Sequence, residues 1–381
     1  MHVFLLNWRD IRHPRMGGAE VLTHGIFARL VARGHRVTWF SSRFPGAART
    51  ERIDGIEIIR GGNAVTVRAH AYRHYAQLDD VDLVVDEINT LPFFAPLYAR
   101  VPVVALICQL ARDVWFYEAP AGIAQIGYAT EPLYLRPYRT VRALTISDST
   151  ARSLRVEMRL HGEIAVMPMA IDQYETSPPL PLEERDNTIV AFGRITPSKR
   201  IDQQLRALSL LVEPPFDRLR LAVVGTGTHK RITSLKRLAE ELCVLHRVDW
   251  PGFVDEVEKR RILSRAKALV MSSVREGWGL AVTEANLAGT PAVGYGILGL
   301  RDSIKNGVTG LTTEESPHAL AQGLRELLSD SGRYSRLAHA AQADAKTLTW
   351  DATTTYVERF LQLALAAQEH SGTHTERNGR S

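Results

Sequence analysis

Two glutamates separated by seven residues, Glu276 and Glu284, bracket the segment of this sequence that says most about its chemistry. Carboxylates at this spacing can bind two separate sets of hydroxyls, such as those of a sugar and of a ribose. Two solvated glutamates on a strand–helix unit are the alternative, and the segment alone leaves the two interpretations about equally open.

The elements around these glutamates would place them beside an anion. The apolar run at residues 268–271 predicts a buried parallel strand, and residues 280–288 predict a helix. Gly277 and Gly279 then fall in the turn between strand and helix, where a backbone can approach a ligand closely. Backbone N–H groups at the start of that helix would face an anion.

A second candidate site is a pair of cations after a predicted strand at residues 188–192. Arg194 and Lys199 would stand at the carboxyl end of that strand, near a helix that starts around Asp202. Arginine offers a forked donor and lysine a point charge, so together they could bind a diphosphate. Most isolated Arg/Lys pairs in loops are only solvated cations.

Two glycine-rich loops add candidates. Gly17 and Gly18 precede the first predicted helix, where exposed N–H groups suit a phosphate, although a plain strand–helix turn is the commoner case. Gly225 and Gly227 follow another predicted strand and suggest a dinucleotide site. The dinucleotide fingerprint fails because Lys230 replaces its third glycine, which disfavours a dehydrogenase.

The alternation of strand-like and helical patterns predicts parallel sheets covered by helices on both faces. The expected strands are residues 3–7, 36–41, 56–60, 83–86, 103–107, 143–146, 164–167, 188–192, 219–224, 248–250, 269–272 and 291–294. A segment rich in proline and charge, residues 177–187, predicts a linker between two doubly wound domains at 1–176 and 188–349. A helical stretch at 350–367 follows, and residues 368–381 are expected to be a disordered tail.

Composition excludes several classes of function. The 381 residues are 45% hydrophobic and can form two domains. The net charge is +5, but the sequence has no dense run of basic residues interleaved with aromatic ones, the pattern that is typical of a nucleic-acid binder. Cys108 and Cys243 cannot make a disulfide framework, which favours a reducing cytosol. The early apolar run at 3–6 is too short for a signal or a membrane span. Asp80 and Asp82 precede a strand and predict a turn, not a metal site.

Taken together, the Glu-x7-Glu segment, the "GR-x4-K" pattern of Arg194 and Lys199, and the "GG-x-E" pattern from Gly17 resemble the retaining glycosyltransferases of the family-4 type, also described as glycosyl transferases group 1. The resemblance extends from Gly17 to Trp350. It implies the GT-B fold, in which two Rossmann-like domains face a cleft, and the helix at 350–367 crosses back to the first domain.

The resemblance assigns roles to particular residues. Arg194, Lys199 and Glu276 would be catalytic, by stabilising the leaving diphosphate and holding the sugar. The residues implied in donor binding are Gly17, Gly18, Gly225, Gly227, Phe253, Gly277, Trp278, Gly279, Leu280 and Glu284. Main-chain groups near Phe253 would contact the nucleobase, and Glu284 the ribose.

The acceptor side is assigned less specifically. Arg12 and Arg15 lie in the first loop, and Gln109, Arg112 and Asp113 follow the predicted strand at 103–107. Cys108 stands where many members of the family have a histidine, so the chain departs from the family at a pocket position.

The implied reaction transfers a sugar from a nucleotide-diphosphate donor to an unknown hydroxyl acceptor, with no metal, no cofactor and no dedicated side-chain base. A nucleotide-sugar epimerase of the same fold and a non-catalytic nucleotide-sugar-binding relative stay open. The expected location is the cytoplasm, with peripheral contact at the inner face of the membrane permitted by the basic composition. No obligate protein partner is evident.

Overall fold

The structure, a computed structural model, describes residues 1–377, with side chains to residue 367. These residues form two compact units. The first unit consists of Met1–Ala111, Ala129–Ala170 and the chain from Thr349 onward, and the second of Arg112–Tyr128 and Ile171–Leu348. The first unit therefore leaves off at Ala170, short of the expected limit at residue 176, and the segment 112–128 groups with the second unit.

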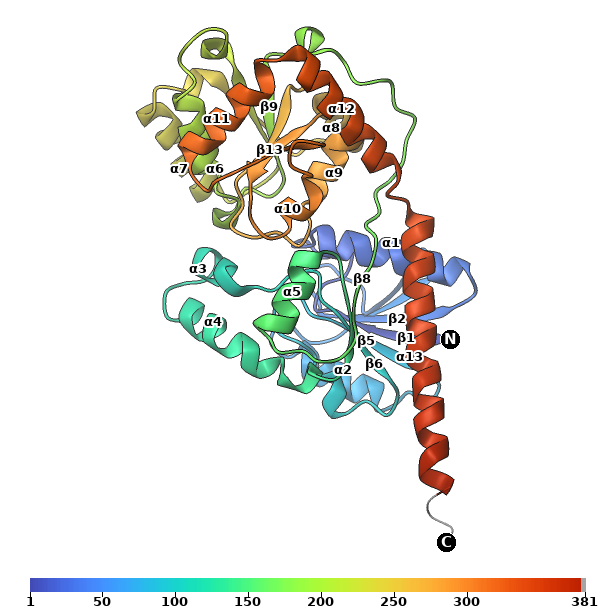
Figure 1. Cartoon of the computed structure of the whole chain (residues 1–381). Coiled ribbons are helices and arrows are strands. Elements are labelled where there is room, and N and C mark those ends of the chain that lie inside the picture. Colours follow the sequence, from blue (N-terminus) through green and yellow to red (C-terminus); the bar gives the residue numbers. More distant parts are fainter. Residues whose placement is uncertain (378–381) are drawn as a thin grey trace. The chain divides into compact units, whose positions relative to one another are not determined.

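Within the described residues, the first unit is built on an eight-stranded sheet in the order β3-β4-β2-β1-β5-β6-β7-β8 (Figure 1). Its strands are β1 (His2–Leu6), β2 (Arg36–Ser41), β3 (Thr50–Ile53), β4 (Ile56–Arg60), β5 (Leu83–Glu87), β6 (Val103–Leu106), β7 (Arg142–Thr145) and β8 (Ile164–Val166). Its main helices are α1 (Gly18–Ala32), α2 (Val67–Tyr75), α5 (Asp148–Val156) and α13 (Trp350–Arg377). All five residues of β1 are buried, because this apolar strand lies inside a sheet that is covered on both faces.

The second unit has a six-stranded parallel sheet in the described residues, in the order β11-β10-β9-β12-β13-β14. The strands are β9 (Thr188–Phe192), β10 (Arg220–Val224), β11 (Val248–Gly252), β12 (Ala268–Met271), β13 (Ala292–Tyr295) and β14 (Gly310–Thr313). The helices are α3 (Trp115–Glu118), α6 (Ile201–Ser209), α7 (His229–Glu241), α8 (Glu256–Arg265), α9 (Leu280–Leu287), α10 (Leu300–Ser303), α11 (Pro317–Leu328) and α12 (Ser331–Lys346), while α4 (Ile123–Tyr134) straddles the two units.

These sheets confirm the predicted α/β architecture of two doubly wound, Rossmann-like domains. The sequence analysis missed two edge strands, β3 and β14. Both are short, and β3 pairs antiparallel with β4 although parallel sheets were expected. Their sequences, Thr-Glu-Arg-Ile and Gly-Leu-Thr-Thr, lack the apolar run that marks a strand buried on both faces.

The C-terminal helix α13 returns to the first unit, as expected, and packs along α1 (Figure 1). Arg29 lies over the Trp350 ring at 4.5 Å, and Gly25 has to be glycine because a Cβ there would come within 2.3 Å of the same ring. Glu358 accepts hydrogen bonds of 2.7 Å from both Arg33 and His35. These hydrogen bonds, from His35 and then Arg33, hold the pKa of Glu358 below its ordinary value.

Helix α13 continues through Arg377, past residue 367 where the sequence analysis ended it. The end of the expected disordered tail, residues 378–381, lies outside the described residues. Among the described helices, none is both long enough and apolar enough to cross a bilayer.

Candidate functional site

The second unit has its topological switch point at β9. The chain proceeds from β9 to β10 and β11 on one side of this strand, and then to β12, β13 and β14 on the other. Ligands of open α/β sheets bind at such a point, outside the carboxyl ends of the strands. A small hollow of about 10 Å³ lies there, lined among others by Gly193, Arg194, Lys199 and Ser273. We call it the β9 pocket.

The loop after β9 is fixed by the loop after β12. The hydroxyl of Ser272 donates to the backbone oxygens of Lys199 at 3.0 Å and Arg200 at 2.9 Å, and the side-chain amide of Gln204 donates to Ser272 Oγ at 3.0 Å. The Val274 N–H also donates to the backbone oxygen of Ser198 at 2.9 Å. The backbone that carries Lys199 is therefore held in one conformation.

Lys199 and Glu276, both predicted as catalytic, form an ion pair and a hydrogen bond between Nζ and Oε1. The hydroxyl of Ser273 donates to the same Oε1 atom at 2.6 Å. The Glu276 side chain is 10% exposed and that of Lys199 is 26% exposed. Because an ammonium group has three donors, Lys199 can keep Glu276 and still offer N–H groups to an anion.

Arg194, the third of these residues, lines the same pocket, and its side chain is exposed. The structure thus brings the Arg194–Lys199 loop and Glu276 to one place, as the sequence analysis expected. It adds that the lysine and the glutamate contact each other, whereas the prediction gave them separate targets. Their roles toward a ligand stay predictions.

The glycines of the loop after β10 have a packing reason to be glycine. A Cβ at Gly225, where φ is +135°, would lie 1.9 Å from the backbone oxygen of Gly193, and one at Gly227 would lie 2.6 Å from that of Ile195. Ile195 and Gly227 also form an isolated parallel bridge. These glycines let the two loops lie against each other and so shape the wall that carries Arg194. Their predicted contact with a donor stays a prediction.

The turn before α9 also needs glycine. Gly279 caps the helix with φ +97°, a left-handed conformation that other residues rarely adopt. The indole N–H of Trp278 donates to Thr283 Oγ1 at 2.8 Å and braces the first turn, which begins at Leu280. Gly277 lies just before this cap.

The sequence analysis missed Gly299. A Cβ at this position, with φ +86°, would lie 2.1 Å from the backbone oxygen of Glu276. The Glu276 N–H donates to the backbone oxygen of Leu298 at 3.2 Å. The position of Glu276 thus depends on a segment that follows it by more than twenty residues, and no local pattern signals this contact.

Glu284, the second glutamate of the signature, is paired with Lys259 of α8 at 2.9 Å. Burial raises the pKa of Glu284, and the charge of Lys259 opposes part of that rise. Lys259 also binds Glu256 at 2.8 Å, and its place in a highly charged helix gave no signal of this role. Phe253, the predicted nucleobase contact, is 81% exposed.

The comparisons with known proteins agree with this geometry. Residues 172–344 match the family model described as Glycosyl transferases group 1. We call residues 172–344, which carry this match, the group 1 domain. The sequence is 28% identical to an uncharacterized glycosyltransferase of Methanocaldococcus jannaschii, over 57% of this chain and 59% of that protein. It is 32% identical to a D-inositol 3-phosphate glycosyltransferase of Xylanimonas cellulosilytica, over 55% of each. The chain thus spans little more than half the length of these relatives.

Solved structures extend the likeness to more than nine tenths of the chain and show the GT-B fold. Sucrose-phosphate synthase from Thermosynechococcus elongatus matches with a TM-score of 0.79 at 18% identity, covering 96% of this chain and 99% of that chain. WaaG, a glycosyltransferase of lipopolysaccharide biosynthesis, matches at 0.73 and 19% identity, covering 93% and 98%. HepE of Anabaena, crystallised with UDP and glucose, matches at 0.72 and 18% identity, covering 95% and 99%.

Outside the group 1 domain, the first loop of the first unit is closed on itself. The buried carboxylate of Glu20 accepts hydrogen bonds from the Gly17 N–H at 2.7 Å and from Arg9 Nε at 2.9 Å. In this structure the Gly17 N–H is therefore not exposed to a phosphate as expected, because it donates to the carboxylate of Glu20 in the first turn of α1. Gly18 is exposed at the start of α1.

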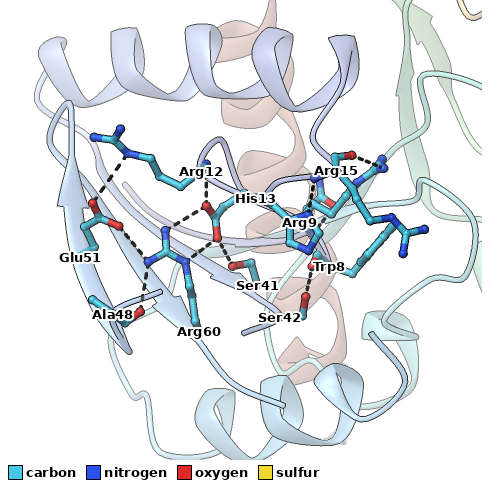
Figure 2. A network of polar contacts seen from close by, with 12 residues as sticks. Trp8, Arg9, Arg12, His13, Arg15, Ser41, Ser42, Ala48, Glu51 and Arg60 are labelled. Atoms are coloured by element: carbon cyan, nitrogen blue, oxygen red, sulfur yellow. Dashed lines mark hydrogen bonds and ion pairs between the residues drawn. The ribbon is translucent and has the colours of Figure 1, made fainter. Parts of the chain in front are cut away.

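The two arginines of this loop are exposed and belong to a wider network (Figure 2). Arg12 approaches Glu51 at 3.8 Å, and the Arg15 guanidinium lies 5.6 Å from the centre of the Trp8 ring. Beneath them, buried Asp10 accepts hydrogen bonds from Arg60 Nε at 2.7 Å and Nη2 at 3.0 Å (Figure 2). Burial would raise the pKa of Asp10, but these bonds outweigh it and hold that pKa below its ordinary value.

The remaining acceptor-side candidates fall into different units. Cys108 is buried just after β6, and half-buried Gln109 follows it. Burial raises the pKa of the Cys108 thiol, and the charges of nearby carboxylates raise it further. Arg112 and exposed Asp113 belong to the segment that groups with the group 1 domain. Arg112 lies over the Tyr128 ring at 3.8 Å and donates to the Tyr128 backbone oxygen at 3.1 Å.

Glu87 is a residue that the sequence analysis overlooked. It ends β5, it is 1% exposed, and neither of its carboxylate oxygens has a hydrogen-bond partner among the described residues. Burial, and then the neighbouring charge of Glu20, raise its pKa to about 8. Two consecutive carboxylates, Asp86 and Glu87, at the end of a strand that begins Leu-Val-Val were the available signal. Within the described residues, no cluster of His, Cys, Asp or Glu could hold a metal ion.

Proposed function

We propose that the chain is a retaining glycosyltransferase that moves a sugar from a nucleotide-diphosphate donor to an acceptor hydroxyl without a metal ion. The group 1 domain and the GT-B fold support the enzyme class. HepE, which shares the fold, was crystallised with UDP and glucose, and this supports a nucleotide sugar as donor. The observation that carries the proposal is the contact between Lys199 and Glu276 at the switch point of the second sheet.

The proposed chemistry begins with charge on the leaving group. When the bond between the anomeric carbon and the phosphate oxygen breaks, the diphosphate gains negative charge. Arg194 and Lys199 line the β9 pocket, where they can stabilise this charge without a metal. Lys199 would direct its remaining donors to the diphosphate while Glu276 accepts hydrogen bonds from the sugar hydroxyls. Glu284 would bind the ribose diol.

Retention follows if the acceptor attacks on the face that the diphosphate leaves. The acceptor oxygen then forms the new bond to the anomeric carbon, and its proton passes to the departing phosphate oxygen. This step needs no side-chain base. It is consistent with the absence of a histidine at Cys108.

The test is an assay of the purified chain with UDP, GDP, ADP and dTDP sugars, each with a panel of lipid, saccharide and small-metabolite hydroxyl acceptors, in the presence of EDTA. The expected result is release of the nucleoside diphosphate that depends on acceptor, with a product of the same anomeric configuration as the donor. An inverted product, loss of activity in EDTA, or epimerisation of the donor without transfer would each overturn a stated part of the proposal.

A further inference from the structure

A second hollow lies in the first unit, outside every residue assigned above to donor or acceptor. It opens where β2 and β4 end, beside α2, and its volume is about 310 Å³. This is near the lower end of the range of small-molecule sites. It holds on the order of ten water volumes, so it has room for more than a lone inorganic ion. We call it the α2 hollow.

The wall of the α2 hollow is strongly basic. The charged and titratable residues that line it are Arg43, Arg49, Arg60, Arg73, His70 and His74. None of the described residues that line it is Asp or Glu. An anion inside the hollow would therefore meet several guanidinium groups and no carboxylate of the wall.

One of these arginines, Arg60, is already neutralised by protein carboxylates, and its bonds hold the base of the hollow in place. Arg60 is 1% exposed and is held by Asp10 at 2.7 Å, by Glu51 at 2.9 Å and by the backbone oxygen of Ala48 at 3.1 Å (Figure 2). Ser41 donates to the same Asp10 carboxylate at 2.6 Å. The base of the hollow is thus preorganised, which lowers the cost of binding a ligand.

The other three arginines have donors to spare. Arg43, Arg49 and Arg73 are exposed, and within residues 1–367 their guanidinium groups make no hydrogen bond or ion pair. In addition, Nε2 of His74 is buried and has no hydrogen-bond partner among the described residues. These groups come from two segments, the loop between β2 and β3 and helix α2, so their convergence is a property of the fold.

The hollow also has an apolar and backbone surface. Phe40 and Ile59 line it together with Gly61 and Gly62. A Cβ at Gly61 would lie 2.8 Å from Phe40 Cζ, and one at Gly62, where φ is +68°, would lie 2.7 Å from Thr66 Oγ1. Glycine at both positions lets the backbone form this wall, against which the organic part of a ligand can pack.

We propose that the α2 hollow binds a phosphate monoester. Guanidinium forks match the oxygens of phosphate, and three arginines without protein partners can neutralise a dianion. The ester group would lie on Phe40 and Ile59. The ligand is either a soluble phosphate ester or the headgroup of a lipid, since both present the same terminal phosphate. This site is separate from the β9 pocket and does not depend on the proposed transferase activity.

Calorimetry on the full chain tests the proposal, with glycerol 3-phosphate as the soluble probe. Phosphatidylcholine vesicles with and without phosphatidic acid serve as the lipid probe. The variants are Arg49→Gln/Arg73→Gln and, independently, Arg43→Gln. The matched control is Arg152→Gln, an exposed helical arginine of α5 in the same unit. Lys199→Ala serves as a second control, because it alters the β9 pocket alone.

The expected result is saturable binding of one probe that weakens at least tenfold in Arg49→Gln/Arg73→Gln, weakens in Arg43→Gln and stays unchanged in both controls. Binding of glycerol 3-phosphate alone identifies a soluble ester, and binding of phosphatidic acid vesicles alone identifies a lipid headgroup. Binding of neither probe, equal affinity in the arginine variants, or loss of binding in Lys199→Ala would overturn the proposal. The last outcome would place the anion in the β9 pocket.

Discussion

The first loops of the two sheets occupy equivalent places but differ in how their charges are used. The loop after β1 and the loop after β9 each follow the strand at which the strand order reverses. In the first loop, Glu20 binds both Arg9 and the Gly17 N–H, while Asp10 binds Arg60. In the second, Arg194 is exposed beside the β9 pocket.

This difference shows that topology alone does not make an anion site. Both loops have glycines or cations where a Rossmann-like sheet can bind phosphate. In the first unit, buried carboxylates neutralise Arg9 and Arg60 and accept the Gly17 N–H, while Arg12 and Arg15 stay exposed. In the second, Glu276, the carboxylate that Lys199 contacts, belongs to the predicted site itself. We therefore expect variants of the first network to change stability, and variants of the second to change turnover.

The largest expected effect is that of Asp10→Ala. The change leaves the buried guanidinium of Arg60 without its main partner, and breaking a buried pair from one side costs about 3 kcal/mol or more. Urea denaturation measures the loss. Asp79→Ala is the control, because Asp79 is 93% exposed and approaches Arg100 at 3.9 Å. A loss below about 1 kcal/mol would mean that the network in the first unit is no more structural than a surface ion pair.

A second effect is the dependence of stability on pH through Glu87. The pKa of Glu87 is raised to about 8 from the ordinary 4.5. Between these values the native state holds the proton and the unfolded chain has released it, so the free energy of unfolding falls as pH rises, by about 1.4 kcal/mol per unit at most. Glu87→Gln should flatten this fall between pH 5.5 and 7.5. Parallel pH curves for the two proteins would exclude Glu87 as its source.

Next in size is Lys199→Ala, which tests the loop after β9. We expect turnover to fall at least tenfold, about 1.4 kcal/mol in activation free energy, while the melting temperature changes little. Lys346→Ala is the matched control, an exposed lysine of the same unit that contacts Gln342 at 3.2 Å. Unchanged turnover in Lys199→Ala would remove the charge argument for this loop.

The smallest effect expected is that of Trp278→Phe. The change removes the hydrogen bond to Thr283 and should lower stability by about 1 kcal/mol. It loosens the turn before α9 without altering a charge, so any loss of turnover should be smaller than that of Lys199→Ala. A larger loss of turnover in Trp278→Phe would mean that turnover depends more on the conformation of this turn than on the charge of Lys199.

Local patterns predicted the elements and the motif residues. Strand β9 was predicted with the bounds that the structure gives, because its apolar run is buried, and β3 was missed because half of its side chains face solvent. The sequence also placed Lys199 and Glu276 in loops that follow strands, and these strands are neighbours in the sheet. It did not predict that the two side chains contact each other.

Contacts between residues far apart in the chain could not be predicted from the sequence. Arg60 lies fifty residues from Asp10, and Lys259 lies twenty-five from Glu284. Nothing in either local segment marks these pairs, because the residue type alone does not tell whether a charged side chain is solvated or buried in an ion pair. The same reason hid the basic α2 hollow, whose arginines come from separate segments.

The binding of nucleoside diphosphates tests the central claim most directly. Calorimetry with UDP, GDP and ADP should find saturable binding of at least one of them to the unaltered chain. Its affinity should fall at least tenfold in Arg194→Ala/Lys199→Ala and stay unchanged in Arg206→Ala/Lys346→Ala, which removes two exposed cations of the same unit. If none of the three binds, or if the first double variant keeps full affinity, the β9 pocket is not where a diphosphate is held.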